Sequence, residues 1–335
     1  MDRDLSVCQA FSERTQRFTS IMNLLVTGAN GFIASHFIRR CSREAGIHVR
    51  GCVRSNERQV PDFVEKHVLG DLSSSTEWRK ALSGIDCVIH LAAKVHDFAH
   101  LKTDPSGDYR QVNVDATLSL AQAAIKAGVR RFIYLSSIGV NGENNDKPFL
   151  ESDIPAPKNP YAISKLDAET GLRELVKNTQ LELVIIRPPL VYGSEAPGNF
   201  NTLTKFLGRG VPLPLKSIVN RRSFIGIENL VDFLIISIKH PDASNEIFLI
   251  SDGEDVSTTV FVERISEAMG VAPRLFYIPR MVLKAGAVLL GRRHIANSLF
   301  ESLQLDISKA RRVLGWVPPV TMKSGLQGAV GDHSA

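Results

Sequence analysis

The sequence predicts an α/β fold: a doubly wound parallel sheet covered by helices, followed by a smaller C-terminal region. Two observations support it. From Asn23 onward, short apolar runs alternate with segments whose apolar residues recur at helical spacing, and the apolar runs are continuous. Continuous apolar strands are typical of a parallel sheet buried on both faces. With 335 residues, the chain is also long for a single compact core.

The expected elements follow one another in strand–helix order. The first strand covers Asn23–Thr27, and the helix after it begins at Phe32 and stops at Gly46. A later helix covers Asp115–Gly128. The remaining strands, of which the first three are expected to be buried, are His48–Val53, Glu65–Gly70, Asp86–Ala92, Arg130–Ser137, Leu181–Pro189 and Asn245–Ser251.

The chain divides into three regions. Residues 1–21 are polar and mixed in charge, so we expect a disordered leader, with Met22 as the alternative natural start. Residues 22–192 form the main α/β domain, to which a strand returns near 228–251. Residues 193–330 contain more loops and form the smaller region. The apolar run 281–291 contains a lysine and is too short to span a bilayer, so it predicts a buried helix.

Composition and charge argue against several classes of protein. The net charge of +5 comes without a run of five basic residues, which favours scattered solvated charge over a nucleic-acid surface and leaves room for a basic cleft. The four cysteines are far apart, as in a reduced cytosolic protein without disulfides or zinc. The N-terminal segment lacks the apolar core of a signal peptide. We therefore expect a cytoplasmic protein with no metal, nucleic-acid or membrane partner.

Glycines follow the first strand at once. Gly28 allows a tight turn, and Gly31 lets the backbone approach a pyrophosphate at the N-terminus of the next helix. Ala34 stands where a third glycine could. Because the motif lies between a strong strand and a strong helix, it favours a Rossmann-type dinucleotide site over a glycine-rich turn of another α/β protein. The expected cofactor contacts here are Gly28, Asn30, Gly31, Phe32 and Ile33.

The residue at the end of the second strand bears on the choice of cofactor. An acidic residue there would bind the ribose hydroxyls of NAD, whereas an arginine suits the extra phosphate of NADP. The sequence has Arg54 at this point and no carboxylate before Glu57. NADP(H) is therefore favoured and NAD(H) is the alternative, unless Arg54 is only a solvated loop residue.

Nine segments in order resemble one family: TGANGFI, GDL, VIHLAA, VNVDAT, YLSSIGVNG, PYAISK, IIRPPLVYG, RRSFIGIENLVDF and DISKARRVLGWVPP. Each segment alone is a weak signal, but their shared order and spacing are specific. From Met22 to about Gly328 the chain resembles the extended short-chain dehydrogenase/reductase family, in the branch of nucleotide-sugar epimerases and 4-ketoreductases that includes UDP-glucose 4-epimerase.

The resemblance implies a Ser/Tyr/Lys active site. The matching hydroxyl is Ser137, with Ser136 as its rival, and it would bind the reacting oxygen. Tyr161 would be the acid/base. Lys165, on the same helix face at i+4, would hold the nicotinamide ribose and, together with the positive nicotinamide ring, lower the phenol pKa. The alternative is that Tyr161 only packs at the start of a helix.

The resemblance also implies further contacts. Asp71 and Leu72 would line the adenine, and Asn113 would make a structural or cofactor-side contact. Ala92 and Ala93 would lie beside the cofactor, together with Leu91 and Pro188.

The smaller region would bind the substrate. A nucleotide-sugar pyrophosphate needs cations, and the family segment picks Arg222, with Arg221 adjacent, unless both are solvated. Asn199 and Phe200 are further candidates. His90, inside an apolar run, is expected to be a core histidine.

Ser137 is not followed by the acidic pair of the dehydratases, so two reactions remain. The favoured one is NADPH-dependent reduction of a UDP-4-keto-6-deoxy-N-acetylhexosamine for surface polysaccharide. The alternative is 4-epimerisation of UDP-glucose or UDP-N-acetylglucosamine with tightly bound NAD. A third possibility of another class is a non-catalytic NADP-binding redox sensor. A homodimer is also expected, since relatives often pair through helices.

Overall fold

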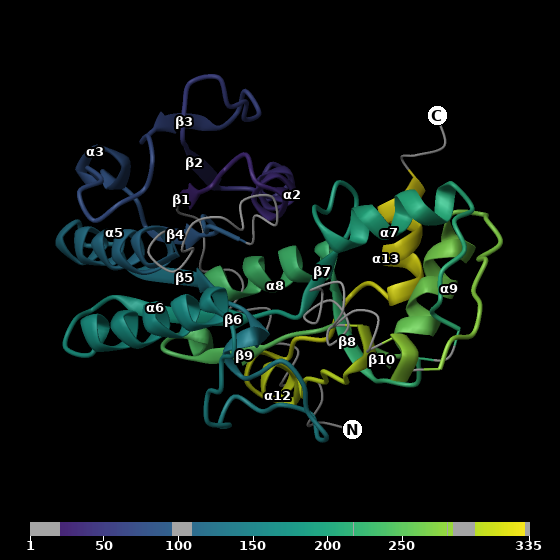
Figure 1. Ribbon diagram of the computed structural model, residues 1–335. Coiled ribbons are helices and arrows are strands. Elements are labelled where there is room, and N and C mark those ends of the chain that lie inside the picture. Colours follow the sequence, from purple (N-terminus) through teal and green to yellow (C-terminus); the bar gives the residue numbers. More distant parts are fainter. Residues whose placement is uncertain (1–20, 96–108, 217, 280, 284–298, 332–335) are drawn as a thin grey trace, which may run out of the picture.

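The computed structural model describes residues 21–95, 109–216, 218–279, 281–283 and 299–331. Seven parallel strands form the main sheet in the order β3-β2-β1-β4-β5-β6-β9 (Figure 1). They are β1 (Met22–Thr27), β2 (Ile47–Val53), β3 (Glu65–Val68), β4 (Cys87–His90), β5 (Arg131–Leu135), β6 (Glu182–Arg187) and β9 (Ile247–Leu249). The strand order reverses beside β1, which confirms the predicted doubly wound Rossmann fold.

Helices cover both faces of this sheet. One face packs against α2 (Phe32–Cys41), α8 (Ile227–Lys239) and α12 (Ser308–Leu314). The other packs against α3 (Arg79–Leu82), α5 (Ala116–Lys126) and α6 (Pro160–Val176). Figure 1 shows α5 and α6 side by side, as their contacts require. The two faces bury separate apolar clusters, as expected for strands that are apolar on both sides.

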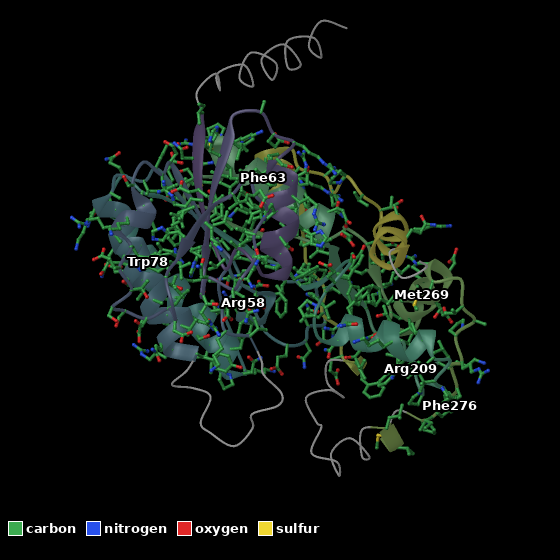
Figure 2. All side chains as sticks on the ribbon, turned by 90° about the horizontal axis from the view of Figure 1, so that it is seen from above. Arg58, Phe63, Trp78, Arg209, Met269 and Phe276 are labelled. Carbon is green, nitrogen blue, oxygen red and sulfur yellow. The ribbon has the colours of Figure 1, made fainter. Side chains whose placement is uncertain are left out.

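A second region is built on three short strands. Its sheet has the order β10-β8-β7, from β7 (Leu190–Tyr192), β8 (Arg222–Gly226) and β10 (Asp255–Val256). The helices α7 (Asn199–Gly208), α9 (Thr258–Ala268) and α13 (Met322–Val330) enclose a third apolar cluster with these strands. Figure 2 shows Arg209, Met269 and Phe276 of this region well away from Trp78 and Arg58 of the main domain.

Two local predictions are wrong. The strand at β3 is not buried: it lies at the sheet edge, pairs only with β2, and exposes Glu65, Lys66 and Val68. The helix after β1 is also shorter than expected, since it ends at Cys41 and the chain then turns toward β2. Phe200 is only 5% exposed in the aromatic cluster of the second region, and its contact with a substrate stays a prediction.

The division into domains stays a prediction, but several elements bear on it. The returning segment near 228–251 contains α8 and β9. The late helix α12 also packs on the main sheet. The expected leader, residues 1–20, lies outside the described residues. So do residues 284–291, which make up most of the buried helix expected at 281–291. At the start of that segment, Met281 and Val282 are exposed. Within the described ranges, no helix has both the length and the apolar character needed to cross a bilayer.

Candidate active site

A cavity of 710 Å³ opens at the carboxyl ends of β1, β2 and β4, where the strand order reverses. In an open α/β sheet this is where ligands bind. The sequence-predicted cofactor residues that line it are Gly28, Asn30, Arg54, Asp71, Leu72, Ala92 and Ala93. The cavity lining does not include Gly31, Phe32, Ile33, Leu91, Asn113 or Pro188.

The glycine turn has the geometry that close approach of a ligand requires. Gly28 has φ +67°, and a Cβ added there would stand 3.0 Å from the Cα of Ala92. The N–H of Gly31 donates to the carbonyl of Gly28 at 2.8 Å, which closes the turn. Gly31 then starts α2 without a side-chain cap, so backbone N–H groups of the first helical turn have no side-chain acceptor there. This cradle fits the pyrophosphate of a dinucleotide.

Cations stand at the mouth of the cavity. Arg54 and Asp71 both line it, and the Arg54 Nε lies 3.0 Å from the Asp71 Oδ1, with both side chains largely exposed. Arg58 and Lys94 line the same cavity and were missed from the sequence. Arg58 lies in an exposed loop with no local motif, so only the fold brings it to the cavity (Figure 2).

Buried polar groups fix the wall of the cavity. The ring of His90, 1% exposed, bonds the Thr27 Oγ1 at 2.7 Å and the Thr117 Oγ1 at 2.8 Å. The Thr27 Oγ1 also accepts from the N–H of Ala92 at 3.1 Å. Burial, with a smaller effect of Lys165, lowers the pKa of His90 to about 3, so the ring is neutral. It is a core histidine, as expected.

Asn113 clamps the loop after β4 to α6. Its amide accepts from the N–H of Lys94 and donates to the Lys94 carbonyl, at 2.8 and 3.0 Å. It also donates to the Ser164 Oγ at 3.0 Å. These bonds occupy the amide nitrogen and the amide oxygen of Asn113 within the protein. The structure therefore shows a structural contact for this residue. Its contact with a cofactor stays a prediction.

The start of α6 positions Tyr161. Pro160 occupies the first helical turn, and the Asn159 side chain accepts from the N–H of Ala162 at 2.9 Å, a standard N-terminal cap. Tyr161 is partly buried, with the ring of Tyr109 packed edge-on at 6.2 Å.

Lys165 lies one turn further along α6 and is 3% exposed. Its Nζ donates to the carbonyl of Leu135 at 2.7 Å and stands over the Tyr134 ring, 4.5 Å from the centroid. The same nitrogen lies 6.0 Å from the centroid of the Tyr161 ring. The lysine therefore joins the helix of Tyr161 to the end of β5.

Ser137 and Ser136 at the end of β5 have different environments. Ser137 is partly exposed, and its Oγ accepts from the N–H of Gly139 at 3.1 Å. A Cβ on Gly139 would lie 3.2 Å from the Cβ of Ala162, so this segment and the start of α6 are in close contact. Ser136 is buried and donates to Glu169 at 2.5 Å. Of the two hydroxyls, only Ser137 is accessible to a ligand.

The predicted lowering of the Tyr161 pKa depends on the nicotinamide ring as well as on Lys165, so it stays a prediction. In the protein alone, burial, with a smaller effect of Tyr109, raises the pKa of Tyr161 to about 12. Burial also lowers the pKa of Lys165 to about 7, against the opposing charge of Glu169. The ammonium bonds the Leu135 carbonyl and is itself desolvated.

The substrate-side candidates are placed on the second region. Arg222 is partly buried on β8, its Nη1 donates to the Glu301 carbonyl at 2.9 Å, and burial lowers its pKa to about 10. Arg221 is exposed, as is Asn199 at the start of α7. Arg222 is thus not a solvated surface arginine. Tyr161, Lys165, Ser137, Asn199 and Arg222 lie outside the lining of the cofactor-type cavity.

Among the described residues, no cluster of His, Cys, Asp and Glu is arranged to hold a metal ion.

Comparisons with known proteins agree with this arrangement. The sequence model of the NAD dependent epimerase/dehydratase family matches residues 24–251. A UDP-glucose 4-epimerase from Vibrio cholerae is 37% identical over 91% of this chain and 93% of its own length. An N-acetyl-α-D-glucosaminyl-diphospho-ditrans,octacis-undecaprenol 4-epimerase from Escherichia coli O157:H7 is 26% identical over 91% of this chain and 93% of its own.

Solved structures share the fold. The UDP-glucuronic acid 4-epimerase from Bacillus cereus, in complex with NAD, has a TM-score of 0.76 at 22% identity and covers 92% of this chain and 98% of its own. The motif order, the sheet topology and the family match lead to one conclusion. The chain belongs to the NAD-dependent epimerase/dehydratase family, that is, to the nucleotide-sugar epimerase branch of the extended short-chain dehydrogenases/reductases.

Proposed function

We propose that the protein is a UDP-hexose 4-epimerase that uses NAD, with UDP-glucose or UDP-N-acetylglucosamine as substrate. The observation that carries the proposal is the joint placement of Ser137, Tyr161 and Lys165 at the end of β5 and the start of α6, in a sheet whose reversal point holds a dinucleotide-sized cavity. The 37% identity to a UDP-glucose 4-epimerase along nearly the whole chain supports it.

The residues that line the cavity would bind NAD. Gly28, Asn30 and the first turn of α2 would hold the pyrophosphate of NAD, and Asp71 and Leu72 would lie against its adenosine half. NAD, when bound, supplies the redox chemistry by taking a hydride from carbon 4 of the sugar and returning it.

The sugar would be oriented by the residues of the chain. Ser137 would donate a hydrogen bond to the oxygen on carbon 4, and Tyr161 would take the proton of that oxygen and give it back. Lys165 would stabilise the phenolate while it exists. Arg222 would bind a phosphate of the nucleotide, since a desolvated guanidinium is a strong partner for phosphate oxygens.

A ketoreductase is the second candidate, because the cations that line the cavity favour it. Arg54 and Arg58 at the cavity mouth suit the extra phosphate of NADP, although Arg54 is paired with Asp71. In this form the protein would reduce a UDP-4-keto-6-deoxy-N-acetylhexosamine with NADPH.

One experiment separates these candidates. The purified protein is incubated with UDP-glucose or UDP-N-acetylglucosamine and NAD, and in parallel with the 4-keto sugar and NADPH. Interconversion of the gluco and galacto forms without net loss of cofactor supports the epimerase. Stoichiometric consumption of NADPH with the 4-keto sugar supports the reductase and refutes the epimerase. Binding of NADP without either reaction would leave a non-catalytic sensor.

A further inference from the structure

A buried ion pair involves Glu169, which lies one helical turn after Lys165 on α6. The carboxylate of Glu169 on α6 accepts two bonds from Arg187 on β6: Nε to Oε1 at 2.9 Å and Nη2 to Oε2 at 2.5 Å. Glu169 is 2% exposed and Arg187 is 3% exposed. Such a pair needs further hydrogen bonds to offset desolvation, and by itself it is weak support for stability.

The further bonds run to the segment that carries Ser137. Ser136 donates to the Glu169 Oε1 at 2.5 Å, and the Arg187 Nη1 donates to the Asn141 Oδ1 at 2.9 Å. The Asn141 side chain in turn donates to the Leu150 carbonyl at 3.1 Å. The pair thus links α6 and β6 to Ser136, which precedes Ser137, and to Asn141, which follows it.

Helix spacing places Glu169 on the face of the catalytic pair. Tyr161, Lys165 and Glu169 follow one another at intervals of four, so they share one side of α6. Lys165 donates to the carbonyl of Leu135, while Glu169 accepts from the hydroxyl of Ser136. Two successive turns of the helix therefore hold Leu135, the last residue of β5, and Ser136, just before Ser137.

In the part of the chain that the structure describes, the other titratable side chains that contact or influence Lys165 carry no charge near neutral pH. His90 from β4 is held neutral by burial, and the raised pKa values of Tyr134 and Tyr161 keep both phenols protonated. Tyr109 packs on the far side of Tyr161.

Glu169 is the group whose charge raises the pKa of Lys165 against burial. It is therefore the carboxylate on α6 that favours the charged form of the buried ammonium, and its two bonds to Arg187 fix its position.

We propose that Glu169 is a positioning residue of this site: its carboxylate, fixed by Arg187 and Ser136, holds α6, and with it Lys165, against the end of β5. The proposal rests on the proposed function only where it concerns the rate of the reaction. It differs from a merely structural role in predicting a change in the titration of Lys165.

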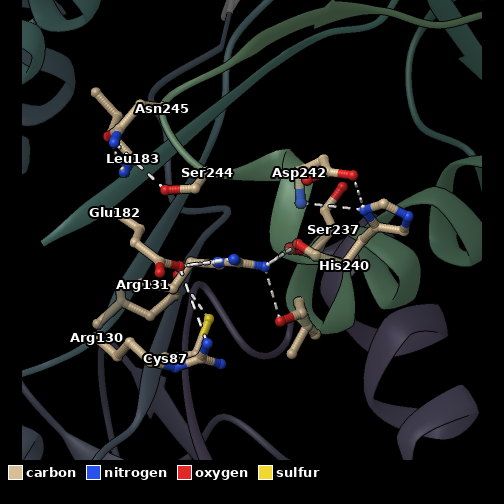
Figure 3. A network of polar contacts seen from close by, with 12 residues as sticks. Cys87, Arg130, Arg131, Glu182, Leu183, Ser237, His240, Asp242, Ser244 and Asn245 are labelled. Atoms are coloured by element: carbon tan, nitrogen blue, oxygen red, sulfur yellow. Dashed lines mark hydrogen bonds and ion pairs between the residues drawn. The ribbon is translucent and has the colours of Figure 1, made fainter. Parts of the chain in front are cut away.

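The fold offers a matched control at the other end of the same two strands. Arg131 at the start of β5 binds Glu182 at the start of β6, with Nε and Nη2 at 2.7 and 2.6 Å from one carboxylate oxygen. Figure 3 shows this pair and the bonds from Arg131 to the end of α8. Glu182→Gln breaks an ion pair between β5 and β6 far along the strands from Lys165.

The test is the titration of Lys165 by NMR of protein with 13C-labelled lysine, with the resonance assigned by its loss in Lys165→Met. Glu169→Gln should lower the Lys165 pKa by about one unit, since a charge one helical turn away is removed from a low-dielectric site. Glu182→Gln should leave it unchanged. An unchanged Lys165 pKa in Glu169→Gln, or equal shifts in both variants, would overturn the proposal.

Two further arms keep the test decisive. If Glu169→Gln does not fold, the double variant Glu169→Gln/Arg187→Met is compared with Arg187→Met alone; the Lys165 pKa should be lower in the double variant, and equal values refute the proposal. If the protein is active, the alkaline limb of its pH–rate profile should move down with the Lys165 pKa. A protein without activity but with the NMR shift would refute the proposed function and support the role of Glu169.

Discussion

Acidification should destabilise this protein through His90. The ring is fully buried between the hydroxyls of Thr27 and Thr117, and its folded pKa is about 3 against 6.5 for the free side chain. Between these two values the unfolded chain binds a proton that the folded chain does not. The stability that the neutral ring contributes is therefore fully present above pH 6.5 and is lost as the pH falls toward 3.

The magnitude follows from the two pKa values. At pH 5 the linkage amounts to about 2 kcal/mol of unfolding free energy, since one pKa unit corresponds to about 1.4 kcal/mol. Urea unfolding is measured between pH 7 and pH 5 for the natural protein and for His90→Asn, which cannot titrate. His90→Asn lowers stability at pH 7, but the loss between pH 7 and pH 5 should shrink by about 2 kcal/mol.

The exposed His48 supplies the control. His48→Asn should keep the full pH dependence of the natural protein. If His90→Asn and the natural protein lose the same free energy between the two pH values, the buried neutral state of His90 is wrong.

Three further outcomes are expected. Tyr161→Phe should slow the reaction by about 10²–10⁴-fold with NAD binding retained, while Tyr109→Phe keeps most of the rate; equal losses would remove Tyr161 from the chemistry. Gly193→Ala should cost about 1–3 kcal/mol in urea unfolding, because its Cβ would lie 2.8 Å from the Cβ of the first residue of α8, whereas Gly331→Ala meets nothing within 4 Å and should be tolerated. Arg54→Ala should weaken NADP relative to NAD by about tenfold in calorimetric titrations if the arginine binds the extra phosphate, and an unchanged ratio contradicts that role.

Much of the fold and part of the site could be predicted because their signals are local. The glycine turn at Gly28 is written in consecutive residues between a strand and a helix, and the structure shows the positive φ that the turn requires. The pairing of Tyr161 with Lys165 follows from the helical repeat alone. The strand–helix alternation was enough to predict the doubly wound sheet.

What could not be predicted depends on contacts between distant residues. Glu169 finds Arg187 and Ser136 only when β5, β6 and α6 are assembled, and no motif links the three. The packing of Phe200 in the aromatic cluster of the second region likewise depends on residues far apart in the sequence.

The effect of burial on the pKa of Tyr161 in the protein alone also depends on tertiary contacts, because the nearby ammonium is bonded to the Leu135 carbonyl. Edge position likewise decides the exposure of β3, and edge position is a property of the whole sheet.

The central claim is that Ser137, Tyr161 and Lys165 serve a reversible oxidation at carbon 4 of a UDP-sugar. The most direct measurement uses UDP-glucose with deuterium at carbon 4, incubated with the protein and NAD in ordinary water, and reads the label in the galacto product by mass spectrometry. The account predicts that the deuterium stays on carbon 4 of the epimerised sugar. Exchange of the label with water during epimerisation, or the absence of any epimerised product, would contradict it.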